Sequence, residues 1–176
     1  MSKLQDIERL LEKGADKVSI NTSAILDPSL VGNAAKKFGS QCIVVAVDSK
    51  REGEKSYVYT HGGKNKTAFE TSAWIKIVEG EGAGEILLTS MDRDGTKIGF
   101  DNELTSSIAK DLSIPLITSG GAGCIDHMIE GITDGKADAV LAASIFHQKE
   151  ITIAAVKDGL ASKLSLIHIS EPTRLP

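Results

Sequence analysis

The sequence predicts an α/β fold in which about five parallel strands form part of a barrel. Short aliphatic runs alternate with helical patterns along the chain, which is the order that parallel βα units produce. The pattern of residues 14–23 recurs at residues 136–144, as expected of a barrel made from two similar halves. A complete (β/α)8 barrel takes about 250 residues. Because the chain has 176 residues and begins on a helical pattern, we expect a partial barrel that lacks its first strands.

Five aliphatic runs predict the strands. The runs show little polar alternation, which is typical of strands that are buried on both faces. They occupy residues 17–20, 42–48, 85–89, 115–119 and 139–142. The second run is the longest and ends abruptly at Asp48. After it, the segment 57–60 and the pair Gly62-Gly63 indicate a small hairpin inserted before the next helix.

Helices are predicted between these strands by apolar residues that recur at helical spacing. Their expected positions are residues 6–12, 28–38, 71–79, 104–112, 125–132 and 151–163. The helix over residues 71–79 is expected to turn four residues toward the core, namely Ala73, Trp74, Ile77 and Val78. Alternating strands and helices of these lengths favour a single domain over residues 1–163.

The last segment, residues 164–176, differs from the rest of the chain. It has no helical stripe and no strand pattern, and it contains two prolines. Its sequence resembles the read-through peptides that sequencing adaptors or vectors leave behind. We therefore expect a non-native tail that takes no part in the fold.

Composition excludes several classes of partner. With 20 basic and 24 acidic residues, the formal charge is −4, whereas nucleic acids and anionic membranes require a clustered basic face. No apolar run approaches the roughly 20 residues that span a bilayer. Cys42 and Cys124 form no recognisable motif, which favours a reduced, cytoplasmic setting. No histidine has metal-ligand spacing with another ligand type, so we predict no metal site.

Asp48 is the first candidate for a catalytic residue. Reactive groups in α/β enzymes lie at the carboxyl ends of parallel strands, and a carboxylate there suits general acid–base catalysis. The alternative is a structural role, in which Asp48 caps the following loop or pairs with Lys50 or Arg51.

A second acidic strand end, 92–96, follows the next strand. Because strand ends converge at one mouth of a barrel, Asp94, which precedes Gly95, is expected to contact the ligand. For Asp92, an ion pair with Arg93 is the simpler interpretation. The two acidic strand ends together favour a catalytic role for Asp48.

Two segments have the properties of a phosphate-binding site. The glycine-rich segment 119–123, which contains Ser119 and Gly121, leads into a helix, and Ala143-Ser144 follows the last strand. Glycine lets backbone amides approach an anion, and a helix start adds favourable partial charge. Tight turns also need glycine, so the loop alone would be weak support. Asn21-Thr22 recurs at the matching place in the earlier half and is the candidate for a second phosphate site.

Several motifs together resemble the cyclase subunits of imidazole glycerol phosphate synthases. The matching segments are residues 14–22, 38–41, 45–48, 82–96 and 119–123, and the resemblance runs from about residue 6 to residue 163. Members of this family are (β/α)8 barrels of histidine biosynthesis, of which this chain would contain strands four to eight. They use ammonia from a glutaminase subunit to convert a ribulosyl aminoimidazole carboxamide nucleotide with two phosphates. The products are imidazole glycerol phosphate and aminoimidazole carboxamide ribotide, and no cofactor is implied.

The resemblance implies roles for individual residues. Asp48 matches a catalytic aspartate of the family, and Asn21 and Thr22 match its first phosphate site. The second phosphate site and the neighbouring substrate contacts would comprise Asp94, Gly95, Ser119, Gly121, Ala143 and Ser144. From their position alone, Lys17 and Glu85 would be a solvated or paired layer at the opposite end of the barrel. The resemblance makes them part of an ammonia gate, with Asp16 and Gln41 at the glutaminase interface.

One departure from the family limits what is expected of the chain itself. The family has a second catalytic aspartate on its first strand, and the predicted strands do not include that one. We therefore expect this chain to be inactive alone. A related isomerase of the same pathway is an alternative, although it docks no glutaminase, so Lys17, Glu85 and Gln41 favour the cyclase. A non-catalytic fragment that binds phosphates or the glutaminase is the third possibility.

Overall fold

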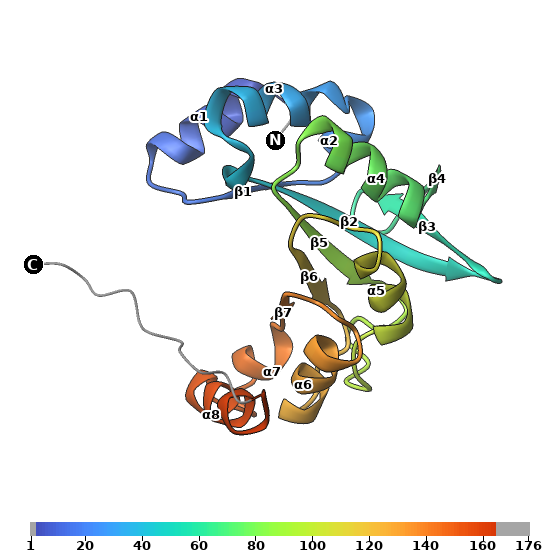
Figure 1. The fold of residues 1–176 in the computed structure, drawn as a ribbon, viewed down its shortest axis with the longest axis vertical. Helices are drawn as coiled ribbons and strands as arrows, with labels where there is room; N and C mark the ends of the chain where they lie inside the picture. Colours follow the sequence, from blue (N-terminus) through green and yellow to red (C-terminus); the bar gives the residue numbers. More distant parts are fainter. Residues whose placement is uncertain (1–2, 165–176) are drawn as a thin grey trace, which may run out of the picture.

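The computed structural model describes residues 3–164, in which five parallel strands form most of one sheet (Figure 1). The strands are β1 (Val18–Ile20), β2 (Ile43–Glu52), β5 (Glu85–Ser90), β6 (Leu116–Ser119) and β7 (Ala139–Leu141). They pair in chain order, β1 with β2, β2 with β5, β5 with β6 and β6 with β7. The predicted number of parallel strands and their positions are thus confirmed, and the sheet is not closed within the described residues.

The predicted hairpin is also present. It consists of β3 (Lys55–Thr60) and β4 (Asn65–Glu70), which pair antiparallel and bring the sheet to seven strands. β2 continues four residues beyond the predicted strand, and Asp48 to Glu52 pair antiparallel with β3. β1 and β3 thus pair with the same edge of β2, β1 along its first residues and β3 along its last.

Helices follow most strands, as the sequence predicts. Their bounds are α1 (Leu4–Glu12), α2 (Thr22–Leu26), α3 (Ser29–Phe38), the short η1 (Ser40–Cys42), α4 (Thr71–Glu81), α5 (Asn102–Ala109), α6 (Ile125–Thr133), α7 (Ser144–His147) and α8 (Ile153–Leu164). In Figure 1, α1, α3 and α4 lie at the upper end of the sheet, and α6, α7 and α8 gather at the lower end beside β7. The short helix α2 was not predicted. No helix in residues 3–164 is long and apolar enough to span a bilayer.

The larger core lies between the helices and one face of the sheet. Alternate residues of β2, namely Ile43, Val45 and Val47, are completely buried in it, because successive side chains of a strand point to opposite faces. Asp48 therefore belongs to the other face of β2. A smaller core joins the last helices to the connection before α5. Its buried members are Phe100, Ala122, Met128, Ile145 and Val156.

The buried face of α4 differs from the prediction. Trp74 and Val78 are buried as expected, whereas Ala73 is exposed and Ile77 is 41% exposed. The helix instead buries Thr71 and Ile75. Both sets of positions have helical spacing. The hydroxyl of Thr71 is 2.7 Å from that of Ser49 at the end of β2, and this contact helps to select the observed face.

Candidate functional site

Polar groups gather where the parallel strands end. The pairing register places Asp48 of β2 beside Thr89 of β5, Thr89 beside Ser119 of β6, and Ser119 beside Leu141 of β7. Side chains at paired positions of neighbouring parallel strands point to the same face. Asp48, Thr89 and Ser119 thus form one polar row across the carboxyl ends of the strands.

Asp48 is partly buried and is held by a side chain from another strand end. The amide nitrogen Nδ2 of Asn21, directly after β1, donates a hydrogen bond to Oδ2 of Asp48 over 3.0 Å. Burial raises the pKa of Asp48 above its ordinary value, the hydrogen bond from Asn21 lowers it, and the charge of Asp94 raises it. Burial dominates, so the net change of the pKa is upward. Neither Lys50 nor Arg51 pairs with Asp48: Lys50 lies over the ring of Tyr59, and Arg51 contacts Glu103.

A hollow of about 280 Å³ lies beside this row. Six residues that the sequence assigned to a phosphate and substrate site line it together, namely Asp94, Gly95, Ser119, Gly121, Ala143 and Ser144. They come from three places in the chain: the connection after β5, the end of β6 with the segment after it, and the start of α7. These six residues, named from the sequence, therefore line one hollow, although the sequence could not give the shape of that hollow.

The glycine segment after β6 is closely packed. Gly121 has a φ of +103°, and a Cβ there would lie 2.2 Å from the carbonyl oxygen of Gly99. The carbonyl of Gly121 accepts a hydrogen bond from the amide of Gly99 over 2.8 Å. Both the conformation and the close approach require glycine at this position. The connection after β5 and the connection after β6 therefore fix each other.

Asn21 and Thr22 lie apart from that hollow. Thr22 begins α2, and its hydroxyl oxygen accepts a hydrogen bond from the amide of His61 in the hairpin turn, over 3.2 Å. The same turn brings Gly63 against the side chain of Met91, just after β5. The hairpin turn thus reaches both Thr22 and the start of the connection after β5. The carbonyl oxygen Oδ1 of Asn21 is buried without a hydrogen-bond partner in the described residues.

Two charged residues pair at the opposite end of the strands. Lys17 lies just before β1 and Glu85 begins β5, and their side chains form an ion pair. Asp16 and Gln41 are exposed and lie two positions before β1 and β2, respectively. These four residues are thus near the amino ends of the strands, away from Asp48.

Three residues close to the site were not singled out from the sequence. Thr89 lies between Asp48 and Ser119. Its hydroxyl group at the end of a predicted strand could have indicated a place in the polar row. His127 accepts a hydrogen bond at Nδ1 from the amide of Gly123 over 3.1 Å, a contact that its spacing of four residues permits. Arg51 was considered only as a partner of Asp48. No group of three potential metal ligands occurs among residues 3–164.

The interpretation of Asp92 was wrong. Its carboxylate oxygen Oδ2 accepts a hydrogen bond from the backbone amide of Arg51 over 2.7 Å, and not a contact from Arg93. The partner lies in β2, 41 positions earlier in the chain. Neighbouring residues in sequence therefore gave no indication of it.

The groups at this site suit two chemical tasks, anion binding and proton transfer. Backbone amides of a glycine segment and the hydroxyls of Ser119 and Ser144 suit the oxygens of an anion such as phosphate. Asp48, with its raised pKa, suits proton transfer to or from a group held near the polar row.

Comparison with known proteins agrees with this picture. A family model described as histidine biosynthesis protein matches residues 1–152. The imidazole glycerol phosphate synthase subunit HisF of Cytophaga hutchinsonii is 53% identical over 160 residues. That alignment covers 91% of this chain and 64% of the relative, so the chain spans somewhat less than two thirds of the relative's length.

Proposed function

Because the chain belongs to the histidine biosynthesis protein family, we propose that it carries part of the barrel of an imidazole glycerol phosphate synthase cyclase. The family's fold is the (β/α)8 barrel, and the five parallel strands would be its strands four to eight. The proposed enzyme uses ammonia to convert a ribulosyl aminoimidazole carboxamide nucleotide into imidazole glycerol phosphate and aminoimidazole carboxamide ribotide.

The hollow beside the polar row carries this proposal. One phosphate of the substrate would bind there, between the glycine segment and Ser144. Asn21 and Thr22 would lie nearer the other phosphate. A substrate that extended between these places would pass over Asp48, which accepts a hydrogen bond from Asn21 and faces the same side of the sheet.

Asp48 would act as the general acid or base of the cyclisation. A carboxyl group whose pKa is raised toward the working pH exchanges protons more readily than one that is always ionised. Asn21 would orient this carboxyl group through its amide. In the family a second aspartate shares the work, and we propose that it belongs to a strand that precedes those described here.

Ammonia would enter from the other end of the strands. We assign the paired Lys17 and Glu85 to the gate and the exposed Asp16 and Gln41 to the surface that docks a glutaminase subunit. The relative is named as a subunit, which supports an assembly with a partner. The place of action would be the cytoplasm.

Titration of the 176-residue chain with inorganic phosphate tests the anion site. We expect saturable binding in the wild type and loss of at least tenfold in affinity, on the order of 1.4 kcal/mol, in Gly121→Ala, because the added Cβ meets the carbonyl of Gly99. Gly14→Ala is the matched control. Gly14 has a similar φ of +94°, but a Cβ there meets nothing within 4 Å. Equal binding by wild type and Gly121→Ala would contradict the assignment.

An assay with the nucleotide substrate and an ammonium salt tests the catalytic proposal. In a chain extended to the length of the relative, Asp48→Asn should lower turnover by a factor of roughly 100 or more while phosphate affinity stays unchanged. The 176-residue chain alone is expected to show no turnover. Cyclisation by the Asp48→Asn variant at the wild-type rate would exclude Asp48 as the acid or base.

A further inference from the structure

The segment 91–101 forms one wall of the hollow and has neither helix nor strand of its own. It connects β5 to α5 and carries Asp94 and Gly95. Irregular segments keep a fixed shape only where contacts hold them, because the backbone itself loses conformational entropy when it is ordered. Contacts at its two ends, together with the hydrogen bond between Gly99 and Gly121, therefore help to set where Asp94 lies.

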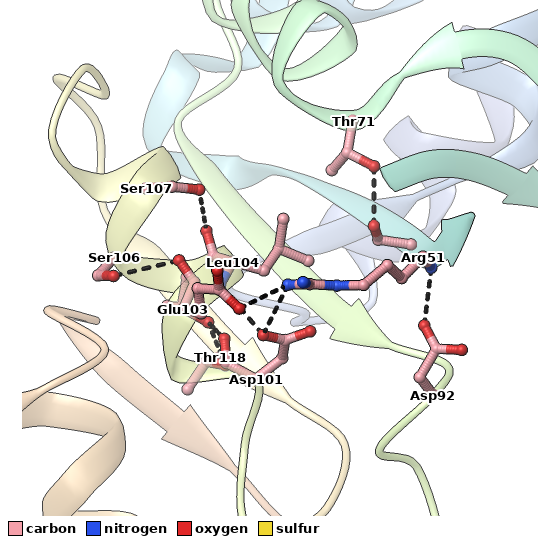
Figure 2. Close-up of polar contacts among 11 residues, drawn as sticks. Arg51, Thr71, Asp92, Asp101, Glu103, Leu104, Ser106, Ser107 and Thr118 are labelled. Atoms are coloured by element: carbon pink, nitrogen blue, oxygen red, sulfur yellow. Dashed lines mark hydrogen bonds and ion pairs between the residues drawn. The ribbon is translucent and has the colours of Figure 1, made fainter. Parts of the chain in front are cut away.

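Arg51 contacts both ends of this segment (Figure 2). At the first end, the backbone amide of Arg51 donates to Oδ2 of Asp92 over 2.7 Å. At the last end, Nη2 of its guanidinium lies 3.8 Å from Oδ1 of Asp101 and donates to Oε2 of Glu103 over 3.0 Å. Asp92 and Asp101 enclose Asp94 and Gly95 between them. One residue of β2 thus joins two points that are nine positions apart in the chain.

Asp101 is the more important of the two carboxylates at the last end. Its side chain is 10% exposed, whereas that of Glu103 is 80% exposed, and exposed ion pairs contribute little. Asp101 also caps the start of α5, since its Oδ1 accepts a hydrogen bond from the amide of Leu104 over 3.1 Å. The guanidinium therefore acts on a residue that is already fixed to a helix start.

Arg51 lies behind the site rather than in it. It is three positions after Asp48 on the same strand, and the alternation of side chains places the two on opposite faces of β2. Arg51 does not line the hollow that contains Asp94. Its contacts thus act on the wall from the face away from the substrate.

We propose that Arg51 is a positioning residue, which holds the segment 91–101 against the end of β2 so that Asp94 and Gly95 stay in place beside the anion site. This role rests on the proposed function. It joins the strand that carries Asp48 and the wall that carries Asp94 into one unit, without contact between Arg51 and the substrate.

Backbone amide hydrogen exchange tests the role of Arg51 directly. In Arg51→Gln, the amides of Asp94, Thr96 and Gly99, which are hydrogen-bonded in the wild type, should exchange roughly three- to tenfold faster. The amides of α4 and β6 should exchange at the wild-type rate. Lys37→Gln is the matched control, because Lys37 forms a 2.6 Å ion pair with Glu8 between α3 and α1, away from the segment.

Phosphate titration of the same variants gives a second measurement. We expect roughly threefold weaker affinity in Arg51→Gln, partial recovery in Arg51→Lys, which keeps the charge, and no change in Lys37→Gln. Asp92→Ala removes the hydrogen bond from the backbone amide of Arg51 and should also weaken phosphate binding. This second variant keeps the test valid if Arg51→Gln does not fold.

The outcomes separate this inference from the proposed function. The positioning role would be overturned if the amides of the segment exchanged at the wild-type rate in both Arg51→Gln and Asp92→Ala. It would also be overturned if exchange became faster to the same extent in all elements. Failure of the wild type to bind phosphate would count against the anion site. In that case the exchange measurement would still decide whether Arg51 holds the segment.

Discussion

Asp48 and Asn21 come from different strand ends, and a hydrogen bond joins their side chains. The sequence identified Asp48 from its place after an apolar run, and it assigned Asn21 to phosphate. The structure adds the hydrogen bond between them, which no spacing rule could reveal because 27 positions separate the residues. The pairing register of β1 with β2 brings them together.

Asp48→Asn should stabilise the folded chain at neutral pH. The pKa of Asp48 is raised in the folded state, chiefly by burial, so ionisation costs folding free energy as the pH rises above the ordinary value of 3.8. An asparagine carries no charge to bury. We expect a higher unfolding free energy than in the wild type at pH 7 and no difference well below the ordinary pKa.

Urea unfolding at several pH values provides the measurement. The exposed Asp16→Asn is a suitable control, because Asp16 is on the surface at the other end of the strands. A lower unfolding free energy for Asp48→Asn at pH 7 than for the wild type would contradict the expectation. Stability gained at the expense of activity is common at catalytic positions.

At the scale of elements, hydrophobic periodicity predicted most of the secondary structure. All five parallel strands and most helices were located from aliphatic runs and helical spacing. The end of β2 was underestimated because residues 49–52 are polar, and only pairing with β3 keeps them extended. The short helix α2 was missed because Asn21-Thr22 matched a phosphate-binding pattern. Tertiary contacts therefore determine the bounds of elements that the local sequence does not specify.

Glu79 of α4 contacts the segment after α5, which Lys76 also contacts through the carbonyl of Asp111. Glu79 accepts hydrogen bonds from the amide of Ser113 over 2.7 Å and from its hydroxyl over 2.6 Å, and Lys76 donates to it over 2.8 Å. These contacts, with that from Lys76 the largest, lower the pKa of Glu79 from 4.5 to about 2. The side chain of Glu79 is 15% exposed and that of Lys76 is 49% exposed, so solvent screens the ion pair in part.

Glu79→Gln should destabilise the chain by about 1–2 kcal/mol at pH 7, because hydrogen bonds to a charged acceptor are lost. Since the folded pKa is depressed, the contribution of Glu79 is complete above pH 4.5 and disappears as the pH falls toward about 2. Unfolding curves of wild type and variant should therefore converge at acid pH. The exposed Glu12→Gln is the control, and a pH-independent difference between wild type and Glu79→Gln would disprove this linkage.

At the scale of the whole molecule, the hydrophobic interior is divided. The larger core contains buried residues of β1, β2, β5, α3 and α4, and the smaller one lies among α6, α7 and α8. The sequence predicted a single domain and did not reveal this division, because each helix has an apolar stripe whichever core receives it. Stability need not be uniform across such a structure.

Hydrogen exchange should show two levels of protection. Amides of β2 and β5, which pair on both sides, should exchange only through global unfolding, whereas those of α6 and α8 should open at lower free energy. Met128→Ala, at a fully buried position in the smaller core, should remove about 2–5 kcal/mol and speed exchange mainly in α6 and α8. Ile86→Ala, in the larger core, is the comparison. Equal acceleration everywhere by both variants would indicate one cooperative unit.

The hairpin has a consequence for the behaviour of the protein at high concentration. Within residues 3–164, β4 pairs only with β3, so its outer side offers free backbone groups to other molecules. Lys66, the second residue of β4, forms an ion pair with Glu52 and lies 4.0 Å from the centre of the Tyr57 ring. A lysine on an outermost strand discourages pairing with a second chain.

Removing that charge should promote aggregation. Lys66→Val would leave an uncharged stretch of high β-propensity between Asn65 and Phe69, and light scattering on gentle heating should rise earlier than in the wild type. Lys64→Val removes the same charge from the turn rather than the strand and should behave as the wild type does. The hairpin whose turn contacts Thr22 would thus also limit pairing between copies of the chain.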